Sequence, residues 1–122
     1  MDSIRVATWN VSWTGRGSRH FDQSQRRIAE IEADILVLTE TTPDLVPAEG
    51  FVAKGGPDWG YSDSPGRRKV LLWSRWPVTD VSNEISEPGG RHVSATVLSP
   101  IGPVRVHAVE GQRCDITHTV VA

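Results

Sequence analysis

The chain has 122 residues with 13 basic and 15 acidic side chains, so its formal net charge is −2. This length allows one small domain or part of one, and the near-neutral charge excludes a field that would draw the whole surface onto nucleic acid or an anionic membrane. A single cysteine, Cys114, excludes an internal disulfide bond and suits a reducing compartment. Because no export signal or long apolar run is present, we expect a cytoplasmic protein without a membrane span.

The first 40 residues predict a strand, a helix and a second strand. The predicted elements are a strand at residues 4–9, a loop at 11–21, a helix at 23–33 and a strand at 35–38. Asp22 and Gln25 have the spacing of a capping box, and apolar residues recur at helical period after them. The order strand, helix, strand predicts a parallel pair joined by a right-handed crossover.

The remainder of the chain predicts irregular structure followed by a meander. Residues 45–68 are rich in Gly and Pro and contain one short strand near 51–53. Further strands are predicted at residues 69–74, 78–85, 93–98 and 104–109, separated by turns short enough for antiparallel hairpins. Neither the helical nor the strand periodicity of apolar residues continues after Val109, so we divide the chain into residues 1–109 and an atypical tail, 110–122. A shift of reading frame near Glu110 is our hypothesis for the tail.

Two polar side chains end the first two predicted strands. Asn10 closes the first apolar run and Glu40 closes the second. Open α/β sheets place their sites at the carboxyl ends of strands, and a carboxylate is a preferred ligand of Mg²⁺. Each residue also has an ordinary alternative, because a strand-end Glu is often only solvated and an Asn there often makes a local turn hydrogen bond.

Four segments, in order, carry a resemblance to a known family, and they are residues 4–11, 33–41, 69–78 and 90–109. They resemble the endonuclease/exonuclease/phosphatase superfamily, which includes deoxyribonuclease I-like nucleases, apurinic endonucleases, inositol-phosphate phosphatases and sphingomyelinases. Residues 4–11 and 33–41 resemble its first two signature strands. Residues 69–78 are similar to the strand that ends in Ser-Arg before a Pro-apolar turn, and residues 90–109 resemble the hairpin that follows. The resemblance implies an α/β fold: the N-terminal half of a four-layer α/β-sandwich, with a mixed sheet and a flanking helix.

The resemblance also implies catalytic and metal-binding roles for the two strand-end residues. Glu40 matches the glutamate that holds the catalytic Mg²⁺, with Mn²⁺ as an alternative ion. Asn10 matches the asparagine that helps to order the metal and the scissile phosphate. Such an ion would neutralise phosphate charge and stabilise a leaving oxygen.

A histidine is the third catalytic residue that the resemblance implies. His107 lies near the end of the last hairpin strand, where family members carry a His or Tyr that contacts the phosphate. Its alternative is an ordinary strand histidine, because a slip of one residue would turn the side chain to the other face. The other histidines match no motif, and these are His20, His92 and His118. We interpret His92, beside Arg91, as a solvated hairpin residue.

Two family motifs are missing from the sequence. Catalysis in the family requires an Asp-x-Asn motif and a late Asp-His pair, and neither occurs in this chain. Because loss of a general base alone costs about 10²- to 10⁴-fold in rate, we expect a truncated Mg²⁺-dependent phosphoesterase that is close to inactive by itself. The substrate of the complete form stays open among DNA, RNA, inositol phosphate and lipid headgroup. We also expect half a domain to leave an apolar sheet face uncovered and to self-associate through it.

A second interpretation is a non-catalytic remnant that binds nucleic acid or protein. Five tryptophans could form a base-stacking platform beside a basic patch; they are Trp9, Trp13, Trp59, Trp73 and Trp76, and the patch is Arg67, Arg68 and Lys69. Packing in the core and at its rim is the ordinary use of such side chains. A dinucleotide-binding domain is disfavoured, because Gly15-Arg16-Gly17 lacks the third glycine of that loop.

Overall fold

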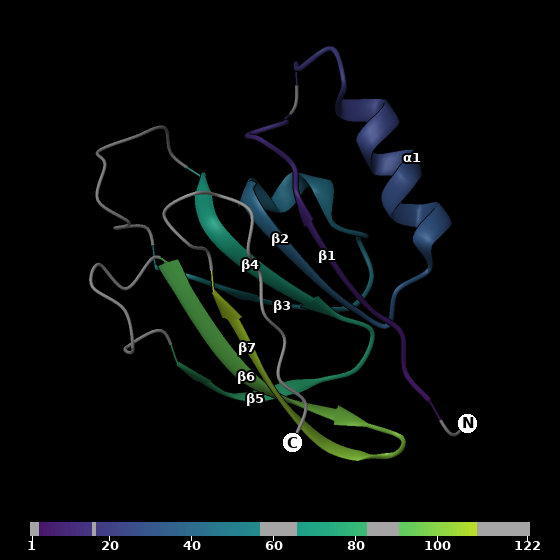
Figure 1. Ribbon diagram of the computed structural model, residues 1–122, viewed down its shortest axis with the longest axis vertical. Coiled ribbons are helices and arrows are strands. Elements are labelled where there is room, and N and C mark those ends of the chain that lie inside the picture. Colours follow the sequence, from purple (N-terminus) through teal and green to yellow (C-terminus); the bar gives the residue numbers. More distant parts are fainter. Residues whose placement is uncertain (1–2, 16, 57–65, 83–90, 110–122) are drawn as a thin grey trace.

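Two β-sheets packed face to face form the body of the structure, and one helix covers the outer face of the larger sheet (Figure 1). The computed structural model describes residues 3–15, 17–56, 66–82 and 91–109. The large sheet has the order β1-β2-β4-β3, and its strands are β1 (Val6–Asn10), β2 (Ile35–Thr41), β4 (Arg68–Ser74) and β3 (Phe51–Lys54). The small sheet is an antiparallel meander of β5 (Val78–Ser82), β6 (His92–Ser99) and β7 (Gly102–Val109).

The helix α1 (Phe21–Ile31) connects β1 to β2, and these two strands are parallel as predicted. The predicted capping box is wrong. His20 is the N-cap residue and makes no side-chain cap, Asp22 lies inside the first turn, and the Gln25 amide donates to the carbonyl oxygen of Asp44 at 3.2 Å. Asp22 still suits its place, because a carboxylate stabilises the positive end of the helix dipole. None of the helices in the described ranges has the length and apolar character to cross a bilayer.

The core between the sheets covers the sheet face that the sequence led us to expect bare. Val37 and Val106, one from each sheet, are both 0% exposed. The buried members of this core are Ile35, Val37, Ala53, Val70, Leu72, Val93, Ala95, Val97, Val104, Val106 and Ala108. The expectation of an uncovered face is therefore corrected: the same chain provides both sheets, so the inner face of the large sheet needs no second molecule.

A second core lies between the large sheet and α1. Phe21 and Ile28 from the helix pack against Leu36, Leu38 and Leu71. This explains why β2 reads as a continuous apolar run, since a strand covered on both faces has no polar side to alternate with.

The predicted four-strand meander is wrong in its first strand. β4 does not form a hairpin with β5 but enters the large sheet between β2 and β3. At the end of β4 the Arg75 backbone N–H donates to the Asp34 carbonyl at 2.8 Å, and its Nε lies 2.9 Å from the Asp34 carboxylate. These bonds hold the chain to the end of the large sheet before Pro77, and the chain then crosses into the small sheet.

β3 confirms the short strand predicted near residues 51–53. It follows Gly50, which has a φ of 108° and lies so close to Trp73 that an added Cβ would be 2.6 Å from the indole Nε1. The same Nε1 donates to the Glu49 carbonyl oxygen at 2.8 Å. Glycine is thus required here, because both the backbone angle and the close approach exclude a side chain.

Candidate active site

Asn10 ends β1 at the carboxyl edge of the large sheet. Its Oδ1 accepts hydrogen bonds from the Ser12 backbone N–H at 2.9 Å and from the Ser12 hydroxyl at 3.3 Å. This local turn is the ordinary role that the sequence allowed for Asn10. Asn10 also lies opposite Thr39 in the parallel pair, and the Thr39 hydroxyl is buried without a hydrogen-bond partner. The edge therefore presents an amide next to a buried hydroxyl.

Glu40 lies near the end of β2 and pairs with a lysine across the sheet. Its Oε2 is 3.3 Å from Nζ of Lys69, and the two side chains are only 13% and 12% exposed. Lys69 faces Glu40 because β2 and β4 are antiparallel, with Thr39 opposite Val70 and Thr41 opposite Arg68. Sequence reasoning missed this pair. The pair follows from the strand register, which a basic residue at the start of a predicted strand does not indicate.

The loop after β1 ties the two strand ends together. The backbone N–H of Val11 donates to the Thr39 carbonyl at 3.1 Å, and that of Trp13 donates to the Glu40 carbonyl at 2.6 Å. Glu40 and Trp13 have left-handed φ angles of 51° and 64°, and Ser12, between Val11 and Trp13, has one of 52°. Among the described residues these are three of the five non-glycine positions with positive φ. Each such residue costs about 1–3 kcal/mol, and such strain tends to gather at functional sites.

The indole of Trp13 lies against two cations. The Arg67 guanidinium carbon is 5.2 Å from the ring centroid, and the Lys69 ammonium is 5.5 Å from it. We call these three residues the Trp13 cluster. Because Lys69 belongs both to the cluster and to the Glu40 ion pair, the cluster and Glu40 form one continuous polar surface.

The structure uses the other tryptophans of the proposed platform differently. Trp9 and Trp73 pack in the core on the helix side, and Trp76 packs against the core between the sheets. Trp59 lies outside the described residues. Of the four tryptophans that the structure describes, Trp13 is the one that does not pack against a core.

His107 lies on the outer face of the small sheet. Its neighbours in β7, Val106 and Ala108, are in the core between the sheets, so by strand alternation His107 points the other way. Its ring stacks on that of His92, with centroids 5.8 Å apart. The described contact of His107 is therefore with His92, and the phosphate contact that the resemblance implies for it stays a prediction.

His92 corrects the interpretation of a solvated hairpin residue. It is 2% exposed, and neither ring nitrogen has a hydrogen-bond partner. Burial lowers the pKa of His92, and the neighbouring His107 and Arg105 lower it further. The interpretation failed because β6 begins one residue earlier than predicted, so His92 pairs with Val109 inside the sheet instead of standing in the turn.

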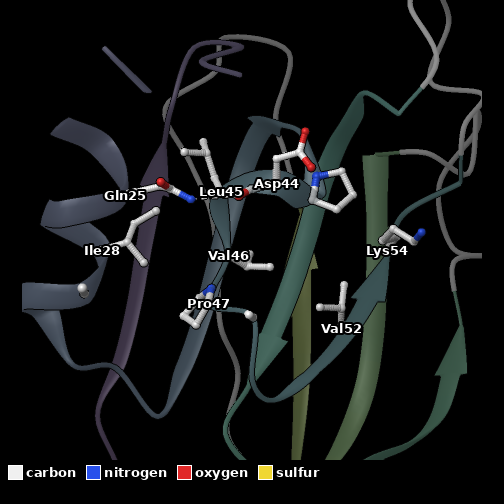
Figure 2. A pocket seen from close by; sticks show the side chains of 11 residues that line it. Gln25, Ile28, Asp44, Leu45, Val46, Pro47, Val52 and Lys54 are labelled. Carbon is white, nitrogen blue, oxygen red and sulfur yellow. Dashed lines mark hydrogen bonds between the residues drawn. The ribbon is translucent and has the colours of Figure 1, made fainter. Parts of the chain in front are cut away.

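A hollow of about 640 Å³ lies away from these residues, between α1, the 3₁₀ helix η1 (Pro43–Leu45) and β3 (Figure 2). Its wall is largely apolar, with Ile28, Leu45 and Val52 among its lining residues. Asn10 and Glu40 are not part of its lining. The hollow is therefore separate from the candidate active site.

The donors at this edge fit a hard divalent ion. Such ions take oxygen ligands and use one or two protein carboxylates alongside water and substrate phosphate. The Glu40 carboxylate and the Asn10 amide oxygen are of this kind, and the Thr39 residue paired with Asn10 has a buried hydroxyl without a hydrogen-bond partner. Within the described part of the chain no group of three or more His, Cys, Asp or Glu gathers. These donors therefore suit an ion whose remaining ligands are water and substrate. In the structure the Glu40 carboxylate is paired with the Lys69 ammonium.

Known proteins provide an independent comparison. Residues 7–118 match the model of the Endonuclease/Exonuclease/phosphatase family. No curated protein sequence matches this chain significantly. Among solved structures, a variant of the 3′ phosphatase NExo from Neisseria, bound to a product DNA hairpin, is 25% identical with a TM-score of 0.57. An endonuclease/exonuclease/phosphatase from Beutenbergia cavernae is 26% identical with a TM-score of 0.50.

A third similar structure shows the fold alone. It is a hairpin-deletion mutant of the β toxin from Staphylococcus aureus, 11% identical with a TM-score of 0.60. The alignments cover 88% of this chain for the Neisseria and Beutenbergia proteins and 94% for the toxin. They cover only 41%, 38% and 55% of those proteins, respectively. The chain therefore corresponds to about half of each related structure.

Proposed function

Because this chain belongs to the endonuclease/exonuclease/phosphatase family, we propose that it is the N-terminal half of a metal-dependent phosphoesterase domain, with Asn10 and Glu40 at its phosphate-facing edge. The observation that carries this proposal is that the two residues lie at the carboxyl ends of adjacent parallel strands, tied by the loop whose N–H groups bind the carbonyl oxygens of Thr39 and Glu40. The Neisseria neighbour, which was solved with product DNA, supports a phosphate ester as the substrate.

We assign Mg²⁺, with Mn²⁺ as its substitute, to the Glu40 carboxylate and the Asn10 amide oxygen. When bound, the ion neutralises phosphate charge and stabilises a leaving oxygen. Glu40 is paired with Lys69, whose ammonium a bound ion would replace, and Asn10 is oriented by the Ser12 N–H before any ligand arrives. Fixed orientation of this kind is what positions a substrate for reaction.

The proposal includes low activity for these 122 residues alone, because they contain no Asp-x-Asn and no Asp-His sequence. Without a general base the attacking water stays weakly activated. Binding of metal and phosphate is then the function that this chain performs by itself. The single cysteine supports a reducing, cytoplasmic location as part of the proposal.

Metal titration tests the assignment directly. We expect the 122-residue chain to bind Mn²⁺, followed by electron paramagnetic resonance of the free ion, and Glu40→Gln to weaken binding at least tenfold. Glu30→Gln is the matched control, since Glu30 is an exposed residue of α1. Equal Mn²⁺ affinity in wild type and Glu40→Gln would overturn the assignment.

A further inference from the structure

We propose that the Trp13 cluster binds a nucleic-acid strand, with an unpaired base on the indole and the adjacent phosphate on Arg67 and Lys69. The inference names nucleic acid as the substrate class, and it rests on the proposed function for placing the reacting phosphate beside Glu40. Its starting point is the position of two cations within 5.5 Å of the ring centroid.

The cluster lies directly beside Glu40. Lys69 contacts Glu40 at 3.3 Å, and the Trp13 N–H donates to the Glu40 carbonyl. Trp13 and Arg67 are both partly exposed, so the cluster is not sealed within the protein. A phosphate bound at Glu40 would therefore have the cluster as its immediate neighbour.

The charge of the cluster is local. The whole chain has a net charge of −2, yet Arg67, Arg68 and Lys69 follow one another where β4 begins. Of these, Arg67 and Lys69 lie against the same indole, so two cations attract phosphate at one place. Binding to nucleic acid is then expected to depend on this place and not on the surface as a whole.

The indole favours nucleic acid over the other substrates that the sequence left open. Cations alone would satisfy the phosphate of an inositol phosphate or a lipid headgroup. An aromatic ring beside the cations adds a flat apolar surface, on which a base stacks whatever its sequence. Of the candidate substrates, only DNA and RNA supply such a base next to each phosphate.

Backbone strain at Trp13 supports a ligand role. A bulky residue with a φ of 64° is held against its conformational preference. Trp73 shows the alternative, because this residue is only 6% exposed and packs in the core on the helix side. The fold thus keeps the Trp13 ring at the edge of the sheet instead of burying it.

Fluorescence anisotropy with a short labelled oligothymidylate tests the proposal on the whole 122-residue chain. The titrations contain a chelator, so that binding does not depend on metal at Glu40. We expect Trp13→Ala to weaken binding about 5- to 150-fold, and an oligonucleotide with abasic sites to bind wild type as weakly. Trp13→Phe should retain most of the affinity, because a phenyl ring also stacks.

The cations are tested by the salt dependence of binding. Arg67→Gln should lower the slope of log affinity against log salt concentration by about 0.7, the value for one contact to a single strand. Arg75→Gln is the matched control, because Arg75 lies just beyond the other end of β4 and should leave the slope unchanged.

Three results would overturn the inference: no binding of the oligonucleotide, equal binding by Trp13→Ala, or equal binding of the abasic ligand. Circular dichroism checks that Trp13→Ala is folded; if it is not, Trp13→Phe and the abasic ligand on wild type decide the question. Mn²⁺ binding without oligonucleotide binding would overturn only this inference. Oligonucleotide binding without Mn²⁺ binding would overturn only the metal assignment.

Discussion

The large sheet has a carboxylate and cation pair at each end of its β2 and β4 strands, and the two pairs are built differently. At one end Asp34 accepts hydrogen bonds on both carboxylate oxygens, from the Arg5 backbone N–H at 2.8 Å and from Arg75 Nε at 2.9 Å. At the other end Glu40 has Lys69 at 3.3 Å, and the backbone around it is left-handed.

This difference separates a structural role from a ligand role for the same kinds of residue. Asp34 joins the start of β2 to the end of β4, with regular backbone bonds beside it. Glu40 is paired with Lys69, whose ammonium is carried on a flexible stem and can be replaced by another cation. We infer that the Asp34 end secures the fold and that the Glu40 end can exchange its lysine for a ligand.

Stability measurements should give the largest difference between the two ends. Asp34→Asn removes a charge and one of two acceptors, and we expect it to lower the free energy of unfolding by about 1–3 kcal/mol. Glu40→Gln should lower it by less, because the glutamine amide oxygen can still accept from the Lys69 ammonium, and the flexible lysine stem lets the ammonium turn toward water. Urea denaturation at one pH compares the variants, and equal losses would remove the distinction between the ends.

The unfolding free energies of the variants must be compared at one pH, because His92 makes the stability of the fold depend on pH. The lowered pKa of His92 means that the unfolded chain binds its proton more readily than the folded chain. Stability from this group is present above its unfolded pKa, about 6.5, and is lost as the pH falls toward the folded pKa. We expect a loss of at most about 1.4 kcal/mol per pH unit in urea titrations between pH 7.5 and 5.5. His92→Gln should flatten this profile, and an unchanged profile would assign it to other groups.

The smallest expected effect concerns competition for Glu40. Lys69→Met removes the ammonium from the carboxylate, and we expect Mn²⁺ affinity to rise about two- to fivefold, the equivalent of a weak ion pair. Arg75→Met changes the pair at the other end and should leave Mn²⁺ affinity unchanged. Calorimetric titration measures both. Weaker Mn²⁺ binding by Lys69→Met would show that Lys69 supports the ion instead of competing with it.

Much of the fold was predictable because local patterns specify its strands. The periodicity of apolar residues and the turn sequences predict the parallel pair β1 and β2, the helix between them and the hairpin of β6 and β7. The place of β4 was not predictable in this way. A short turn at Pro77 suits a hairpin equally well, and only long-range packing moves β4 into the large sheet.

The candidate site was predictable in part for the same reason. Asn10 and Glu40 end strands whose apolar runs are evident, and their catalytic and metal-binding roles stay predictions. Lys69 and Trp13 depend on strand register and on a left-handed loop, which no local pattern specifies. The predicted start of β6 was one residue too late, and this error was enough to predict a solvated His92 where the structure has a buried one.

The left-handed backbone at Ser12, Trp13 and Glu40 has a consequence for how the sequence would evolve. Glycine adopts such angles without strain, but glycine in place of Trp13 or Glu40 would lose the contact with Lys69. The exposed Ser12 hydroxyl makes a 3.3 Å bond to Asn10, so Ser12→Gly loses less and should make the protein more stable. Directed evolution that selects only for heat resistance offers a way to see this: glycine should accumulate at position 12 before positions 13 and 40.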